Sequence, residues 1–87
     1  MTEGKRAEAL AKGEVSVRVK RSGMFQVLPF RVVRKKTPSG EVPYLVLDRF
    51  LDMSELMRVA EEYSLPVESP AGRMFPRGSK ESDFAGL

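Results

Sequence analysis

The chain has 87 residues, no cysteine, no histidine and a formal net charge of +3. This length allows one small domain, and the composition excludes disulfides, thiolate or histidine metal ligands and a histidine general base. No apolar run approaches the roughly 20 residues that span a bilayer, so we expect a soluble cytoplasmic protein without metal or cofactor.

Charge is distributed unevenly along the sequence. Residues 15–40 carry seven cations and no acid, whereas residues 41–69 carry seven acids and two cations. A folded domain with this pattern is expected to have a positive side, and positive surfaces attract polyanions. The pattern therefore predicts a class of partner and no specific activity.

Residues 1–13 contain small apolar residues between charges and end at Gly13, which is typical of a short helix or of a frayed arm. Both interpretations stay open. An isolated helix of this length is marginally stable in water, and only Leu10 offers much apolar area for docking.

A period of two begins at residue 14, where valines alternate with polar residues as in a half-buried strand. Ser22-Gly23 and the segment from Thr37 to Gly40 are turn signals that separate this strand from two further apolar runs, residues 24–36 and 41–48. The sequence therefore predicts a three-stranded antiparallel β-meander. Pro29 and Pro43 should lie at a bulge or where an amide would face away from a partner.

Apolar residues at helical spacing predict an amphipathic helix from Asp52 to Ser64, packed on one face of the sheet through Met53, Leu56, Met57 and Ala60. Pro66 ends this helix, and residues 65–68 can add a short fourth strand. Residues 69–87 are rich in Pro, Gly and Ser and predict a disordered, flexible tail. The predicted fold class is thus a small α+β domain over residues 14–68.

The two turns fix which residues share a face. A two-residue loop at Ser22-Gly23 and a four-residue loop from Thr37 to Gly40 both separate an apolar core face from a mixed face. The core face gathers Val15, Val17, Val19, Leu28, Phe30, Val32, Leu45 and Leu47. The mixed face gathers Ser16, Arg18, Lys20, Arg31 and Lys35 with Phe25, Val27, Val33, Val42, Tyr44 and Val46. Because a solvated sheet face needs few apolar residues, we expect something to cover the mixed face.

The mixed face predicts a non-catalytic nucleic-acid-binding module, in which cations contact phosphates and aromatic rings stack on bases. The candidate binding residues are Arg18, Lys20, Arg31 and Lys35 on the face, Arg34 and Lys36 at the second turn, and Phe25 and Tyr44 for stacking. Single strands and duplexes, DNA and RNA, all stay open. The alternative is a protein-interaction or homodimerisation module that buries the same face.

Catalytic readings have little support in the sequence. Glu61 and Glu62 point in different directions on a helix, and no glycine-rich segment has the spacing of a phosphate-binding loop. No base is placed beside a nucleophile, so we expect neither an enzyme nor a small-molecule substrate.

Three basic antiparallel strands followed by a helix are similar in outline to sheet-reading DNA-binding domains, such as those of plant ethylene-response factors and integrase arm-binding domains. With an N-terminal helix included, the order also resembles the double-stranded RNA-binding domain. The lysine-rich start of that family's last helix is absent here, where Asp52, Ser54 and Glu55 stand instead. The similarity is one of topology.

Overall fold

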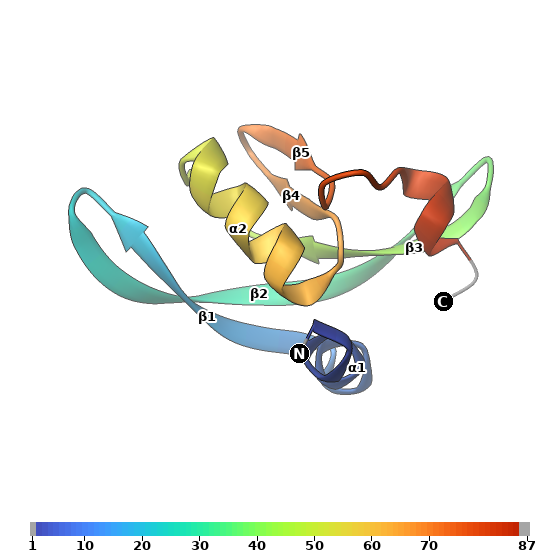
Figure 1. The fold of residues 1–87 in the computed structure, drawn as a ribbon, viewed down its shortest axis with the longest axis horizontal. Coiled ribbons are helices and arrows are strands. Elements are labelled where there is room, and N and C mark those ends of the chain that lie inside the picture. Colours follow the sequence, from blue (N-terminus) through green and yellow to red (C-terminus); the bar gives the residue numbers. More distant parts are fainter. Residues whose placement is uncertain (1, 86–87) are drawn as a thin grey trace.

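The computed structural model describes residues 2–85; Met1, at the start of the predicted arm, and Gly86 and Leu87, at the end of the predicted tail, lie outside the described residues. Its elements are α1 (Thr2–Lys12), β1 (Glu14–Arg21), β2 (Met24–Thr37), β3 (Gly40–Val46), α2 (Met53–Tyr63), β4 (Val67–Ser69), β5 (Gly72–Met74) and the 3₁₀ helix η1 (Glu81–Phe84). Figure 1 shows this order along the chain. The protein is a small α+β domain, as the sequence predicts.

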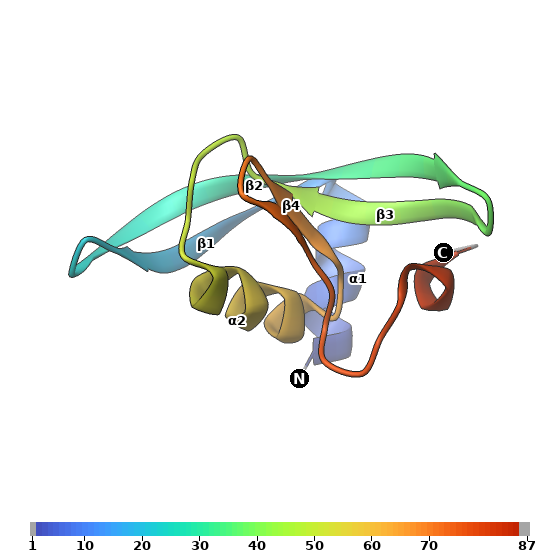
Figure 2. The same ribbon diagram turned by 90° about the horizontal axis from the view of Figure 1, so that it is seen from above.

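One five-stranded sheet organises the molecule, and its strands lie in chain order from β1 to β5. All neighbours are antiparallel except β3 and β4, which are parallel and connected through α2. Both helices lie on the same side of the β1–β3 meander (Figure 2), and η1 lies against β3. The meander is confirmed, and the short fourth strand is joined by a fifth that the sequence analysis does not predict.

The predicted register is confirmed in both hairpins. Arg21 pairs with Met24 and Val17 with Leu28 across the first turn, and Lys36 pairs with Glu41 across the second. Ser22 and Gly23 have φ values of 51° and 79°, the left-handed pair that a two-residue hairpin loop requires. The neighbouring strands therefore twist without splaying apart.

Both prolines of the sheet lie where no ladder donor is needed. The Lys20 N–H points away from β2, toward α2, so the pair of Lys20 and Phe25 exchanges no ladder hydrogen bonds. The pair of Ser16 and Pro29 lies four residues along the same ladder and is of the same kind, so no backbone N–H is needed at Pro29. The Leu45 N–H points toward the side of β3 on which β4 lies. The backbone nitrogen of Pro43, two residues earlier, faces the same side, but β4 does not extend that far, so no hydrogen bond is lost there. The ladder consequently runs through Pro29 without a bulge.

The core lies between the sheet and the helices. Val17, Val19, Leu28, Phe30, Leu45 and Leu47 of the predicted core face are buried, and Val15 and Val32 are half-buried. Helix α2 covers them with Leu56, Val59, Ala60 and Tyr63, and Ala9 of α1 joins the same cluster. The N-terminal segment is therefore a helix, docked through Ala9 as well as the half-buried Leu10.

Helix α2 begins and ends as predicted, with Asp52 and Ser64 as its flanking residues. Ser64 adopts φ 53°, and the Leu65 N–H bonds to the Ala60 carbonyl at 3.2 Å, which closes the helix. The buried face differs from the prediction at three positions, since Val59 is buried, Met57 is only half-buried and Met53 is 47 % exposed. Met53 lies in the first turn, at the end of the helix away from Tyr63, so it covers little of the core.

The prediction of a disordered tail is not confirmed, because its described part, residues 69–85, includes β5 and η1 and packs in part against the domain. Its last part, here called the C-terminal strap (residues 75–85), carries the buried Phe84 and the half-buried Phe75. Pairing with β4 is limited to Leu45 and Val46 of β3, and η1 of the strap lies against β3. Contacts to β3 supply the apolar burial that the strap sequence lacks on its own.

Neither helix among residues 2–85 combines the length and apolar character needed to cross a bilayer.

Candidate nucleic-acid interface

The structure separates the predicted binding residues into two groups at opposite ends of the hairpins. Arg18, Lys20 and Phe25 lie near the β1–β2 turn, whereas Arg34, Lys35, Lys36 and Tyr44 lie toward the β2–β3 turn. Arg31 is exposed between them on β2. The longest dimension of the molecule is 38 Å, so the two groups do not form one compact site.

Tyr44 is buried and cannot stack on a base. Its hydroxyl donates a hydrogen bond to Glu81 of the C-terminal strap, and its ring contacts Phe75 edge-on with centroids 6.2 Å apart. Burial, reinforced by the Glu81 carboxylate, raises the pKa of Tyr44 to about 12. Alternation places Tyr44 on the mixed face, which we expect to be covered; the cover over Tyr44 is the C-terminal strap, whose Glu81 lies 37 residues further along the chain.

Lys35 is also engaged within the protein. Its ammonium forms an ion pair with Glu68 of β4 and lies 5.5 Å from the centre of the Tyr44 ring. The Lys35 ammonium, together with Arg73, holds the pKa of the Glu68 carboxyl below its usual value. A phosphate would therefore have to displace Glu68 before it could bind Lys35.

The group near the β1–β2 turn is accessible. Phe25 is 63 % exposed, and the Arg18 guanidinium lies 4.5 Å from the centre of its ring, close enough for a cation–π interaction. Val27, opposite Arg18 on the ladder, is 66 % exposed. This face is thus an exposed apolar surface bordered by cations.

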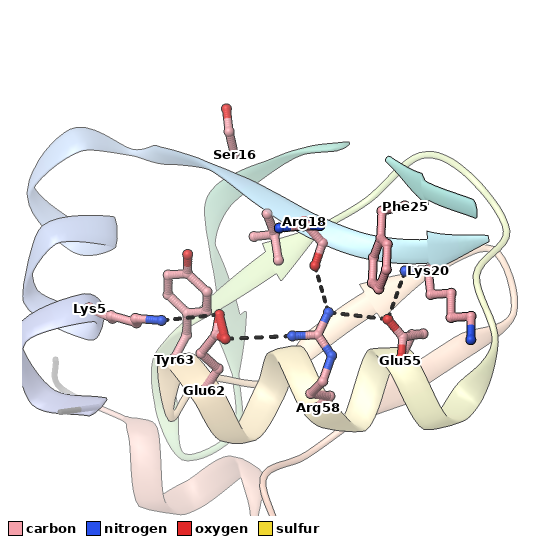
Figure 3. A pocket seen from close by; sticks show the side chains of 10 residues that line it. Lys5, Ser16, Arg18, Lys20, Phe25, Glu55, Arg58, Glu62 and Tyr63 are labelled. Carbon is pink, nitrogen blue, oxygen red and sulfur yellow. Dashed lines mark hydrogen bonds and ion pairs between the residues drawn. The ribbon is translucent and has the colours of Figure 1, made fainter. Parts of the chain in front are cut away.

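Two side chains of α2 protect the outer edge of β1. Glu55 accepts a hydrogen bond from the Lys20 N–H at 2.9 Å, and Arg58 donates one to the Arg18 carbonyl at 2.6 Å (Figure 3). The Lys20 amide, helped by Arg58, lowers the pKa of Glu55. Because an unpaired strand edge invites pairing with another chain, these contacts block β1 from extending the sheet.

A groove of about 750 Å³ runs between β1 and the two helices, with Arg18, Lys20 and Phe25 in its wall. Ion pairs cross it, since Lys5 bonds Glu62 at 3.4 Å and Glu62 bonds Arg58 at 3.5 Å (Figure 3). Its two acids, Glu55 and Glu62, are already paired with Arg58 and Lys5, and as acids they repel a polyanion. The groove is therefore a weaker candidate for a polyanion than the outer surface of the hairpin.

The cations of β1 and β2 differ from most others in the chain in their partners. Within residues 2–85, five of them form no ion pair with an acidic side chain: Arg18, Lys20, Arg21, Arg31 and Lys36. By contrast, Lys5, Lys12, Arg58 and Arg73 each contact an acid, as does Lys35 of β2. Five of the cations on β1 and β2 therefore lack an ion-pair partner among the described residues.

The sequence analysis misses Arg21 and Met24 as candidate binding residues. They face each other across the first turn, and Met24 is 68 % exposed, the largest value among the exposed apolar residues that the structure describes. The signal was present, because the register already placed both residues at the turn. By alternation both residues lie on the side of Val17 and Val19, so the mixed face does not include them.

No group of three or more carboxylates in the described part of the chain is arranged to hold a metal ion.

In comparisons with known proteins, no family model, curated protein or solved structure matches this chain.

Proposed function

We propose that this protein is a non-catalytic nucleic-acid-binding module whose contact surface is the β1–β2 hairpin. The observation that carries the proposal is the set of five cations on these strands that form no ion pair with an acid among the described residues. Phosphates would supply the missing counter-charge and release bound counterions, which gives binding that weakens with salt.

The exposed ring of Phe25 adds a second line of support. Exposed aromatic side chains beside cations can contact bases or sugars while the cations contact the backbone. With Tyr44 and Lys35 engaged by Glu81 and Glu68, the proposed surface is smaller than the one predicted from sequence. It consists of Arg18, Lys20, Arg21, Phe25, Arg31 and Lys36.

The test is a titration of a fluorescently labelled mixed-sequence oligonucleotide at two salt concentrations. Arg31→Glu combined with Lys36→Glu should weaken binding more than tenfold and reduce the salt slope by about 1.8 for a duplex, because two phosphate contacts are lost. Folding stability should change by less than about 1 kcal/mol, since both side chains are exposed.

A matched control carries the same change in charge elsewhere. Arg49→Glu combined with Arg77→Glu takes the net charge from +3 to −1, as the first pair does, because each reversal removes two charges. Both control residues are exposed and lie outside the hairpin. Equal weakening by the two pairs would mean that only net charge matters, and absence of binding at low salt would refute the proposal.

Homodimerisation through the same surface is the second candidate, favoured by the exposed apolar residues Met24, Phe25 and Val27. Sedimentation of the free protein over a range of concentrations distinguishes it. A dimer that is lost on Phe25→Ala, together with no response to oligonucleotide, would replace the nucleic-acid proposal.

A further inference from the structure

The end of the β1–β2 hairpin projects from the domain. Residues 22–27 are all exposed, and in both ribbon views the turn forms one extremity of the molecule, beyond the start of α2 (Figures 1 and 2). The two-residue turn keeps this end narrow. We call residues 20–25 the hairpin tip.

Each face of the hairpin tip carries one cation opposite one large apolar side chain. Lys20 pairs with Phe25 on one face, and Arg21 pairs with Met24 on the other, because adjacent residues of a strand point to opposite faces. Both apolar side chains are more than 60 % exposed. The tip is therefore a narrow apolar edge with positive charge on both sides.

This arrangement fits a slot between two layers better than a flat surface. A flat partner would bury one face of the tip and leave the other apolar side chain in water. Adjacent base pairs of a duplex form such a slot when they are partly unstacked, with phosphates on either side of it. Phe and Met are among the side chains that proteins insert between base steps.

We propose that Met24 and Phe25 form a wedge that inserts between base pairs of a nucleic-acid duplex, while Lys20 and Arg21 contact the flanking phosphates. The inference rests on the proposed function and specifies its ligand as double-stranded. Insertion opens the base step and kinks the duplex, and the bend brings more of the cationic hairpin against the backbone.

The burial of Tyr44 favours a duplex over a single strand. Binding of single strands uses several aromatic rings on which successive bases stack. On the sheet of the described structure, Phe30 and Tyr44 are buried, which leaves Phe25 as the accessible aromatic side chain. One ring at the end of a ribbon suits insertion at a single step.

The distribution of charge favours a long polyanion over a membrane or a second copy of the chain. Exposed cations continue from the hairpin tip to Arg31 and Lys36 along β2, so they follow the length of the molecule, whose longest extent of 38 Å is close to one duplex turn of about 34 Å. A lipid surface reached by the tip would leave the distant cations without a partner. Two hairpin tips packed together would oppose like charges, which is unfavourable.

The experiment uses the full chain and a mixed-sequence duplex of about two turns, labelled at both ends for energy transfer and carrying 2-aminopurine near its centre. Binding of the natural protein should bend the duplex, raising energy transfer, and should unstack bases, raising 2-aminopurine fluorescence. Phe25→Ala and Met24→Ala should each weaken affinity about tenfold and reduce both signals. Phe50→Ala is the matched control, because Phe50 is 67 % exposed but lies outside the hairpin, and it should change neither.

Several results would overturn the wedge. Binding without bending or unstacking, or a single strand bound as tightly as the duplex, would leave the proposed function standing and remove the wedge alone. Tighter binding to phosphatidylserine vesicles than to duplex would assign the hairpin tip to a membrane. A Phe25-dependent dimer would assign it to self-association. No binding to any oligonucleotide would remove the proposed function as well.

Discussion

Replacing Tyr44 by Phe removes the hydroxyl that ties the C-terminal strap to β3. The ring is buried, and its hydroxyl donates to the Glu81 carboxylate. Hydrogen bonds to charged groups contribute roughly 1.5–3 kcal/mol. Because the Glu81 side chain is 27 % exposed, water can replace part of the lost bond. We therefore expect Tyr44→Phe to lower the free energy of unfolding by about 1 to 2 kcal/mol.

Urea unfolding at neutral pH measures this loss, which corresponds to a lowering of the melting temperature by about 4–8 °C per kcal/mol in a domain of this size. A double-mutant cycle with Glu81→Ala, which removes the acceptor, isolates the pair. Since each single substitution breaks the same hydrogen bond, the double variant should be less destabilised than the sum of the two. We expect a coupling of at least about 0.5 kcal/mol.

Alkaline pH provides a second measurement of the same contact. Folding raises the pKa of Tyr44 from 10.0 to about 12, so the folded state holds this proton more tightly than the unfolded chain. The stabilisation is fully present below pH 10 and is lost as the pH rises toward 12, by about 2–3 kcal/mol in total. The Tyr44→Phe variant has no hydroxyl to titrate at this position, so it lacks this pH-dependent loss of stability. The pKa of Tyr63 is also raised, but Tyr63 titrates in both proteins, so its contribution cancels in the difference between them.

The reasoning is refuted if the two substitutions are additive and the two proteins lose stability equally between pH 10 and 12. That result would mean that the hydroxyl does not contact Glu81, and hence that the C-terminal strap does not dock as described. Tyr44 would then be an accessible residue of the mixed face, as the sequence suggests.

Two further predictions concern the β1 edge and the β1–β2 turn. The Lys20 amide holds the pKa of Glu55 below 4.5, so its stabilisation is present above pH 4.5 and is lost as the pH falls through the lowered value. Glu55→Gln should therefore flatten the acid side of a stability–pH curve measured by urea unfolding; an unchanged slope would contradict the edge contact. Gly23→Ala should destabilise by about 1 kcal/mol in thermal unfolding, because φ at Gly23 is +79°. Gly4→Ala, in α1 with no atom near the new methyl group, should instead stabilise the fold by roughly 0.5–1 kcal/mol. If both substitutions stabilised or both destabilised the protein, the positive φ at Gly23 in the turn would be contradicted.

The sequence predicts the meander and its register because both are set locally. Val15, Val17 and Val19 alternate with polar residues, and a slip of one residue would expose all of them. Ser22-Gly23 supplies the positive φ values of the tight turn. The apolar alternation and the turn residues thus predict the same strand register, which is why the pairing of Arg21 with Met24 can be predicted from the sequence.

The strap and its effect on the candidate site could not be predicted in this way. Tyr44 and Val42 belong to the mixed face by alternation, yet both are buried because residues far along the chain cover β3. The ion pair between Lys35 of β2 and Glu68 of β4 likewise joins two residues that are 33 positions apart in the sequence. Alternation tells which face a side chain occupies; what lies over that face depends on contacts between distant segments.

The order of strands in the sheet also bears on how the chain can fold. Because spatial order equals chain order, each strand adds beside the one that precedes it, and no strand has to be inserted between two others. The two hairpins involve contacts of short sequence separation, which favours rapid formation. Longer loops close when β4 pairs with β3, when α2 packs on α1 and β1, and when η1 reaches β3. We therefore expect the part of β3 that the strap covers to stay open until the strap docks, and the Tyr44 ring to report on that docking.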